Sequence, residues 1–238
     1  MTGRIFITGD KHGAMFLISR FAECNHIHEN DILIIAGDTE YVWNEDYKYS
    51  IETLQQIFPG IIAFIDGNHD NHVLLNQFEV TLWNRGNVHK IGERVYHLMR
   101  GELYSIYGNN IFVFGGARSN DKDRRQAGIS WWEEEEPSFT EISYGLKKLS
   151  VHGENIDYII THESPLSARK YISRKKEIAP DYHLPAIFDV WYKKIKNNPR
   201  FKKWYFGHMH VNQVIEPTLH AIYSDIIQMG DSLYHNED

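Results

Sequence analysis

The pattern of apolar and polar positions predicts alternating strands and helices over the first eighty residues. Apolar runs at residues 4–8, 32–36 and 61–65 are nearly continuous, as expected for strands that are covered on both faces. Between them, residues 14–25 and 47–58 carry apolar side chains at helical spacing. Because a helix joins each strand to the next, we expect a parallel sheet.

The pattern changes from about residue 88. The stretch VYHLMRGELYSIYGNNIFVFGG, residues 95–116, predicts antiparallel strands with Gly108-Asn109 as a hairpin turn. After a polar segment at 118–137, we expect a helix near 138–151, a strand within 156–165, a helix within 182–197, a strand within 203–210 and short strands over 211–228. No repeat, low-complexity stretch or linker interrupts this order. We therefore expect one α/β domain over residues 1–238.

The composition is that of a globular protein. Hydrophobic residues make up 42% and charged residues 24% of the chain, which argues against disorder. The net charge of -7 opposes broad binding to nucleic-acid backbone. The single cysteine, Cys24, excludes an internal disulfide and suits a reducing compartment. No apolar run approaches the length of about 18 residues that spans a membrane, and the first strand leaves no room for a signal peptide. We expect a cytoplasmic protein without a membrane partner.

Each predicted parallel strand ends in residues that bind metals or move protons. The five ends read Gly9-Asp10-Lys11-His12, Gly37-Asp38, Gly67-Asn68-His69-Asp70, Thr161-His162 and Gly207-His208-Met209-His210. Any one of these segments resembles an ordinary turn, since Gly, Asn and Asp favour turns. Five of them after five predicted strands indicate a site, because the carboxyl ends of strands in one parallel sheet line one crevice.

Two Asp, one Asn and four His at these ends form a mixed oxygen and nitrogen donor set. Such a set suits Mn, Fe, Zn and related ions, and the lack of a thiolate argues against a structural zinc site. Seven donors are too many for one ion and suit two ions that share a carboxylate. In Asp10-x-His12 and His208-x-His210, an extended backbone would place both side chains of a pair on the same side.

The order DxH, GD, GNHD, H and GHxH, from Asp10 to His210, resembles the calcineurin-like metallophosphoesterase superfamily. The resemblance implies an αββα sandwich, in which helices flank two mixed β-sheets and a dinuclear metal centre lies at the C-terminal ends of strands. It also implies two divalent metal ions per chain, for which we expect Mn, with Fe, Zn and Ni compatible. By motif, the first ion would be held by Asp10, His12 and His210, the second by Asn68, His162 and His208, and both by Asp38.

The resemblance also implies the hydrolysis of phosphoester bonds. A hydroxide that bridges the two ions would attack phosphorus, while the ions neutralise the phosphoryl oxygens. His69 would protonate the leaving alkoxide as a general acid. Asp70 would fix the tautomer and the orientation of the His69 ring.

One departure from the family bears on the substrate. Protein serine/threonine phosphatases continue the second motif as GDxxDRG, with an arginine that grips phosphate, whereas this chain reads GDTEYVW. We expect the substrate phosphate to be bound by cations of residues 118–137, namely Arg118, Lys122 and Arg125. Trp131 and Trp132 would offer a stacking face for a base. The alternative is a solvated loop whose arginines pair with residues 133–136 and whose tryptophans lie partly in the core.

The sequence leaves three functions to compare. The first is a phosphoesterase that acts on a small phosphorylated substrate, such as a nucleotide or a cyclic phosphodiester. The second is a phosphoprotein phosphatase, which the missing arginine disfavours. The third is a binding module without catalysis, against which the intact His69-Asp70 pair and the full ligand set argue. The natural substrate, the preference for mono- or diesters and the oligomeric state do not follow from the sequence.

Overall fold

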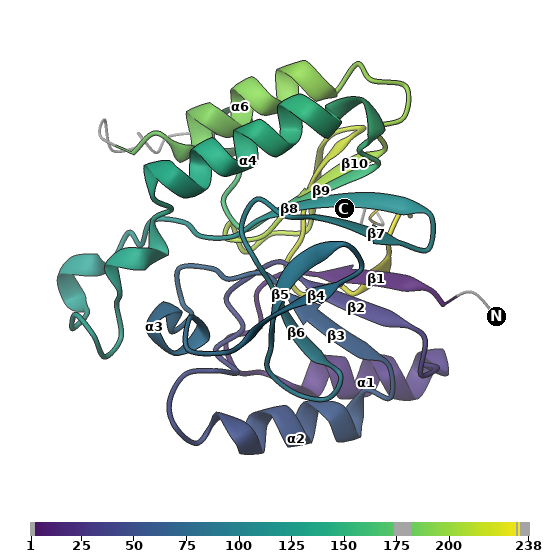
Figure 1. The fold of residues 1–238 in the computed structure, drawn as a ribbon, viewed down its shortest axis with the longest axis vertical. Coiled ribbons are helices and arrows are strands. Elements are labelled where there is room, and N and C mark those ends of the chain that lie inside the picture. The colour runs from purple at the N-terminus through teal and green to yellow at the C-terminus, as the bar shows by residue number, and fades with distance from the viewer. Residues whose placement is uncertain (1–2, 174–181, 232, 234–238) are drawn as a thin grey trace.

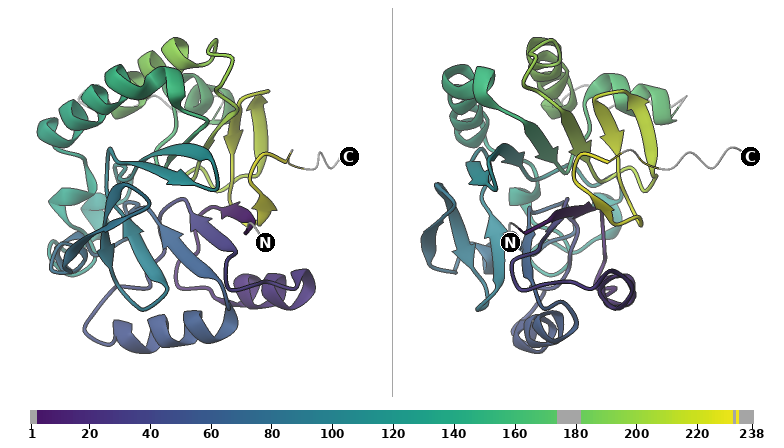
Figure 2. Two further views of the ribbon diagram at one scale, coloured as in Figure 1. Left: turned by 45° about the vertical axis from the view of Figure 1, so that its right-hand side comes forward. Right: turned by 90° about the vertical axis from the view of Figure 1, so that its right-hand side faces the viewer.

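Two β-sheets lie face to face, and helices cover the outer face of each (Figures 1 and 2). The computed structural model describes residues 3–173, 182–231 and 233. Helices α1 (Phe16–Asn25) and α2 (Tyr47–Ile57) lie at the bottom of Figure 1, and α4 (Phe139–His152) and α6 (Leu184–Ile195) lie at its top. This arrangement confirms the predicted αββα sandwich of two mixed sheets.

The first sheet is built mainly from the N-terminal part of the chain. Within the described residues its strands are, in spatial order, β13 (Ile227–Gln228), β1 (Ile5–Thr8), β2 (Ile32–Ile35), β3 (Ile61–Phe64), β6 (Val95–Leu98), β5 (Gly86–Lys90) and β4 (Val80–Trp83). The strands β1, β2, β3 and β6 are parallel, and the others are antiparallel to their neighbours. Helix α1 follows β1, α2 follows β2, and the short helix α3 (His72–Leu75) comes after β3. The predicted start of the fold, three parallel strands joined by two helices, is confirmed.

The second sheet is built mainly from the C-terminal half. Its described strands are, in spatial order, β11 (Gln213–Glu216), β12 (Leu219–Ala221), β10 (Lys203–Phe206), β9 (Tyr158–Thr161), β8 (Asn109–Phe114) and β7 (Leu103–Ile106). Helix α5 (Leu166–Ser173) follows β9, and short 3-10 turns lie at η1 (Lys122–Arg124), η2 (Glu133–Glu135) and η3 (Gly153–Asn155). Helix α4 starts where the sequence predicts, because Ser138 and Glu141 form a capping box at its first turn.

The core lies in three layers, one between the sheets and one beneath each set of helices. In β2, Ile32 and Ile34 point into the layer between the sheets, whereas Leu33 and Ile35 point toward α1 and α2. Successive side chains of a strand face opposite sides, so a strand between two apolar layers needs apolar residues at every position. This explains the continuous apolar runs in the sequence.

The structure corrects the interpretation of residues 95–116. Strand β6 lies in the first sheet, antiparallel to β5 as predicted but parallel to β3, whereas β7 and β8 form an antiparallel hairpin in the second sheet. The hairpin turn is Tyr107-Gly108, one residue earlier than predicted, because Ile106 pairs with Asn109. Both turn residues have left-handed φ angles of 48° and 79°, as a tight two-residue hairpin turn requires.

Besides the 3-10 turns η1, η2 and η3, four short helices and strands were not predicted, namely α3, β4, β5 and α5. Strand β4 is half exposed and α3 has only 4 residues, so neither produces a long apolar pattern. None of the helices that the structure describes is long and apolar enough to cross a membrane.

Candidate active site

The five predicted strand ends meet where the two sheets come together. Strands β1, β2 and β3 end there in the first sheet, whereas β9 and β10 end there in the second. The expectation that all five belong to one sheet is therefore wrong, because β9 and β10 pair with β8 and β12 instead. Glycines allow these strand ends to approach one another closely. A Cβ on Gly37 would lie 2.2 Å from His162 Nδ1, and one on Gly207 would lie 2.5 Å from Asp10 Oδ1.

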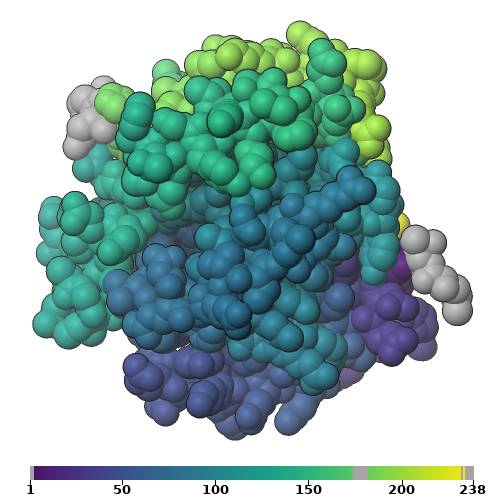
Figure 3. Space-filling view, viewed as in Figure 1, coloured from purple at the N-terminus to yellow at the C-terminus, as the bar shows by residue number. Residues whose placement is uncertain are grey.

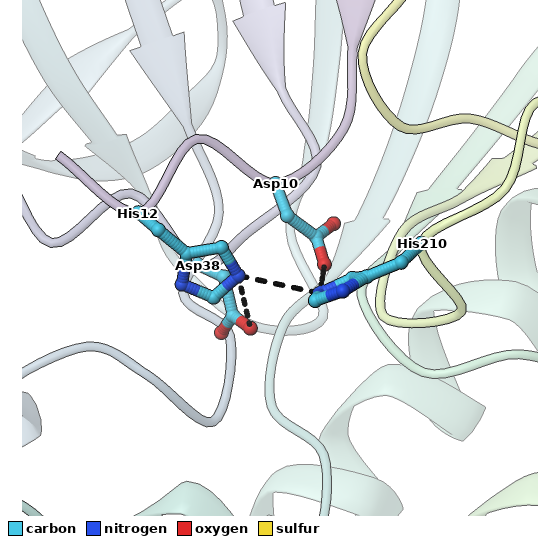
Figure 4. Close-up of side chains that lie close together, drawn as sticks. All are labelled: Asp10, His12, Asp38 and His210. Atoms are coloured by element: carbon cyan, nitrogen blue, oxygen red, sulfur yellow. Dashed lines mark hydrogen bonds and ion pairs between the residues drawn. The ribbon is translucent and has the colours of Figure 1, made fainter. Parts of the chain in front are cut away.

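One cluster of donors joins the ends of β1, β2 and β10. Asp10, His12, Asp38 and His210 each place a donor atom within 4.8 Å of the others (Figure 4). His210 Nε2 lies 3.0 Å from Asp10 Oδ2, and His12 Nε2 lies 3.3 Å from His210 Nε2 and 3.8 Å from Asp38 Oδ2. Two carboxylates and two imidazoles that converge in this way fit one divalent cation.

A second cluster lies beside the first and shares Asp38. The donors of Asp38, His162 and His208 lie within 4.8 Å of one another, with His162 Nε2 3.3 Å from Asp38 Oδ1. The amide oxygen of Asn68 is 3.1 Å from the same His162 nitrogen. The other ring nitrogen, Nδ1, lies 2.7 Å from the Ala36 carbonyl oxygen and donates to it, which directs Nε2 into the cluster. The seven residues predicted as ligands thus form two adjacent donor sets with one shared carboxylate.

The charges at the second cluster favour a cation. Burial alone would lower the pKa of His162, but the adjacent Asp38 carboxylate raises this pKa to about 10. Burial would raise the pKa of Asp38, yet the neighbouring histidines, His162 first, hold it far below its usual range. A proton on His162 balances the charge of this buried carboxylate, and a divalent cation bound between them would supply positive charge in place of that proton. The residues present therefore fit a metal centre.

The model of the calcineurin-like phosphoesterase family matches residues 3–212. The chain belongs to this family. The TT1561 protein of Thermus thermophilus has a similar solved structure, with a TM-score of 0.51 at 12% identity, covering 94% of this chain and 89% of that one. A second solved structure has a TM-score of 0.51 at 11% identity and covers 93% of this chain and 90% of its own. A 5'-nucleotidase from Candida albicans SC5314 has a TM-score of 0.40 at 13% identity, with 94% of this chain and 45% of that chain covered. No curated protein matches the sequence significantly.

The backbone of this family member is left-handed at several site residues. His12, His208 and His210 have φ angles of 45°, 63° and 50°. The expectation of extended Asp10-x-His12 and His208-x-His210 segments is therefore wrong. As a result His208 and His210 point into different clusters, while Asp10 and His12 share one. Such backbone conformations in residues other than glycine cost roughly 1–3 kcal/mol each and gather at functional sites.

The structure places His69 at the edge of the two clusters but separates its ring from Asp70. The buried Asp70 carboxylate accepts hydrogen bonds from Thr39 Oγ1 at 2.8 Å, from Gly67 N at 2.8 Å and from Glu40 N at 3.0 Å. Among the described residues, no hydrogen bond joins it to the His69 ring. Asp70 instead ties the loop after β3 to the loop after β2, so its predicted contact with the ring is not found.

A carboxylate that the sequence interpretation missed, Glu40, lies beside His69. Its Oε1 atom is 2.8 Å from His12 Nδ1 and 3.5 Å from His69 Nδ1. Burial would raise the pKa of Glu40, but the two histidines, His12 first, lower it to about 2. The signal in the sequence was an acidic residue two positions after Asp38, in GDTE.

Four further residues hold the donors in place, and none was predicted. Ser119 accepts a 3.1 Å hydrogen bond from Asn68 Nδ2 and donates one of 2.6 Å to Glu135, which turns the Asn68 oxygen toward His162. Glu163, fully buried and paired with Arg169 at 2.8 Å, places Oε2 3.8 Å from His208 Nε2. Glu163 follows His162 directly, whereas Ser119 and Glu135 are far from Asn68 in sequence and left no local signal.

The structure separates the three cations predicted to bind substrate. Arg125 reaches the site: its Nη2 is 2.9 Å from His69 Nδ1 and also contacts Nε2 of that ring. Lys122 lies over the Trp131 ring at 4.0 Å. Arg118 pairs with Glu136 at 3.1 Å, as the alternative of a solvated loop predicted. Trp132 is buried and packs edge-on against Trp43, so it presents no stacking face.

Proposed function

We propose that the protein is a two-metal phosphoesterase that hydrolyses a small phosphorylated compound, a nucleotide or a cyclic phosphodiester, with Mn as the leading metal. The proposal depends on one observation: two donor clusters share the Asp38 carboxylate, with His69 at their edge. By their positions, Asp10, His12 and His210 would hold one ion, Asn68, His162 and His208 the other, and Asp38 both. Two such ions, when bound, lower the pKa of a water molecule and neutralise phosphoryl oxygens.

His69 is suited to deliver a proton to the leaving group. Its backbone N–H donates a 2.7 Å hydrogen bond to Asp38 Oδ1, which holds the residue next to both clusters, and its ring is partly exposed. Glu40 near Nδ1 would accept a ring N–H and so fix the orientation of the imidazole. We assign Glu40, in place of Asp70, as the residue that orients the His69 ring.

Arg125 is the cation best placed to bind the substrate phosphate. Asp121 holds its Nε at 2.9 Å, and the backbone carbonyl of Ser130 accepts from its Nη1 at 3.3 Å. These contacts aim the Nη2 edge of the guanidinium at His69. A phosphate oxygen beside His69 would attract this edge more strongly than an imidazole nitrogen does, because hydrogen bonds to an ionised acceptor are stronger. Arg125 would thereby supply the positive charge that the GDxxDRG arginine supplies in protein phosphatases.

A hydrolysis screen of the metal-reconstituted protein tests this function. The substrates are an aryl phosphomonoester, its diester, 2′,3′- and 3′,5′-cyclic nucleotides and a phosphoserine peptide, each with Mn, Fe(II), Zn or Ni. We expect hydrolysis of a small ester or a cyclic nucleotide, and none by Asp38→Asn. A clear preference for the phosphopeptide would favour the phosphoprotein phosphatase. No turnover of any substrate with any metal, despite measured metal binding, would favour the binding module.

A further inference from the structure

Strand β4 forms an open edge of the first sheet. Among the described residues it pairs only with β5, through a register in which Val80 faces His89 and Leu82 faces Asn87. The hairpin formed by β4 and β5 lies at the front of the molecule in Figures 1 and 3. In the right-hand view of Figure 2 it lies at the left margin. An open strand edge offers backbone donors and acceptors to another strand.

The unpaired backbone groups of β4 belong to Val80 and Leu82. Lys90 N donates to Glu79 O, so the backbone of Glu79 faces β5. In an antiparallel ladder, residues that face the partner strand alternate with residues that face away from it. Thr81 and Trp83 therefore bond toward β5, and the N–H and C=O groups of Val80 and Leu82 point to the open edge.

The side chains of the same two residues are also uncovered. Val80 is 50% exposed and Leu82 is 74% exposed, whereas Trp83, which points to the other face, packs against the layer between the sheets. Proteins commonly block an open edge with Lys, Pro or a bulge, and β4 has none of these. The one feature of β4 that limits pairing with another strand is its short length of 4 residues.

We propose that β4 pairs antiparallel with β4 of a second copy of this chain, about a two-fold axis at Thr81. In this register Val80 faces Leu82 of the second copy and Leu82 faces Val80 of the second copy. The outward backbone groups then form two reciprocal pairs with two hydrogen bonds each, and the four exposed apolar side chains meet on one face.

The charges at the ends of the strand select a second copy in this orientation. Glu79 precedes β4 and Arg85 follows it in the hairpin turn, and both are exposed. An antiparallel two-fold pairing brings Glu79 diagonally toward Arg85 of the second copy, and does so twice. A parallel pairing would bring like charges together. Because the contact is small, the dimer should dissociate in the micromolar range or above.

Sedimentation velocity of the full chain, from micromolar to submillimolar concentration, tests the dimer. We expect the parent to dimerise with rising concentration. Glu79→Arg and Arg85→Glu should each weaken the dimer about tenfold, since each creates two like-charge contacts. The double variant should restore it, because it exchanges the two charges. Glu23→Arg, an exposed reversal on α1, is the matched control and should dimerise like the parent.

A second variant tests the backbone pairing. Val80→Pro removes an N–H that points away from β5, so the fold should tolerate it while dimerisation is lost. In the parent, hydrogen exchange at the Val80 and Leu82 amides should slow as concentration rises. A parent that stays monomeric throughout overturns the proposal. A dimer that withstands both charge reversals and Val80→Pro uses another surface, which overturns it as well.

Discussion

Asp38 presents one carboxylate oxygen to each donor cluster, which makes it the side chain on which both ions would depend. Asp38→Asn removes the shared negative charge and replaces one oxygen by an N–H donor, which cannot bind a cation. We expect both ions to bind more weakly. Elemental analysis after reconstitution with excess Mn measures this, with Asp46→Asn at the start of α2 as the control. A parent limited to one ion per chain, or an Asp38→Asn variant that retains two, would refute the shared site.

The role proposed for His69 in proton transfer predicts a dependence on the leaving group. His69→Ala should leave the metal content intact and lower kcat by about 10²–10⁴-fold for an alkyl ester. The loss should be smaller for nitrophenolate, which needs little protonation. Steady-state kinetics with the two esters measures the difference. Equal losses for both esters would assign His69 to positioning or to charge stabilisation.

Arg125 and its neighbour Arg124 form a matched pair for testing substrate binding. Arg125 contacts the His69 ring, whereas Arg124 is exposed in η1. We expect Arg125→Ala to lower kcat/KM at least about tenfold, the effect of losing one charged hydrogen bond to phosphate. Arg124→Ala and Arg118→Ala should have smaller effects, with the metal content unchanged in all three variants. If Arg125→Ala hydrolyses every substrate like the parent, phosphate recognition lies elsewhere, with Lys11 and Asn71 as the next candidates.

At the scale of elements, the loops after β2 and β3 act as one unit. Asp70 accepts hydrogen bonds from both loops, and the left-handed residues Asp38 and Glu40, with φ angles of 48° and 55°, lie within this unit. The loop after β2 is therefore held in its strained conformation by a carboxylate from the next strand.

This arrangement predicts that Asp70 contributes to stability and metal binding rather than to proton transfer. Asp70→Asn should lower the free energy of unfolding by roughly 1–3 kcal/mol, because one oxygen that accepts from buried N–H groups becomes an N–H donor. Urea denaturation of the metal-free protein measures the loss. Unchanged stability, together with the leaving-group dependence expected for His69→Ala, would contradict this prediction. It would favour the original hypothesis that Asp70 orients the His69 ring.

At the scale of the whole molecule, a buried group of charged and titratable residues lies behind the end of β3. Arg100 pairs with Asp66 at 2.6 Å and with Glu141 at 3.1 Å, and it donates to the Glu134 carbonyl at 2.8 Å. It thereby joins the end of β3 to α4 and to the segment that carries Arg125. His72 lies against the same pair, with Nδ1 3.7 Å from Asp66.

This group predicts a loss of stability in mild acid. Burial, followed by the charge of Arg100, lowers the pKa of His72 to about 3. The unfolded chain binds this proton below a pKa of about 6.5 and the folded chain does not, so stability falls as pH drops from there toward 3. From pH 7 to pH 5, His72 alone should lower the free energy of unfolding by roughly 2 kcal/mol.

Urea denaturation of the parent and of His72→Gln, each at pH 7 and at pH 5, measures the effect. Between pH 7 and pH 5, the free energy of unfolding of the variant should fall by about 2 kcal/mol less than that of the parent. His28→Gln, an exposed substitution, is the control. A His72→Gln variant with the pH dependence of the parent would contradict the prediction.

The five strands that end at the site, and the motif residues that follow them, could be inferred from the sequence alone. Each of β1, β2, β3, β9 and β10 is a mostly apolar and buried run, and its first donor residue follows within four residues of its end. Strand burial and the position of a residue after a strand are local properties, so they can be inferred without knowing the partners. The order of these ends along the chain was sufficient to indicate the family.

The grouping of these residues into two clusters depends on the three-dimensional fold. Left-handed backbone at His208 and His210 sends adjacent motif residues into different clusters, and no sequence spacing shows such φ angles. Which carboxylate meets the His69 ring, and which cation, depends on loops from other strands: Glu40 is 29 residues from His69, and Arg125 is 56 residues away. Contacts between loops are set by the packing of the two sheets, and a linear pattern of apolar residues specifies the strands but not where their loops meet.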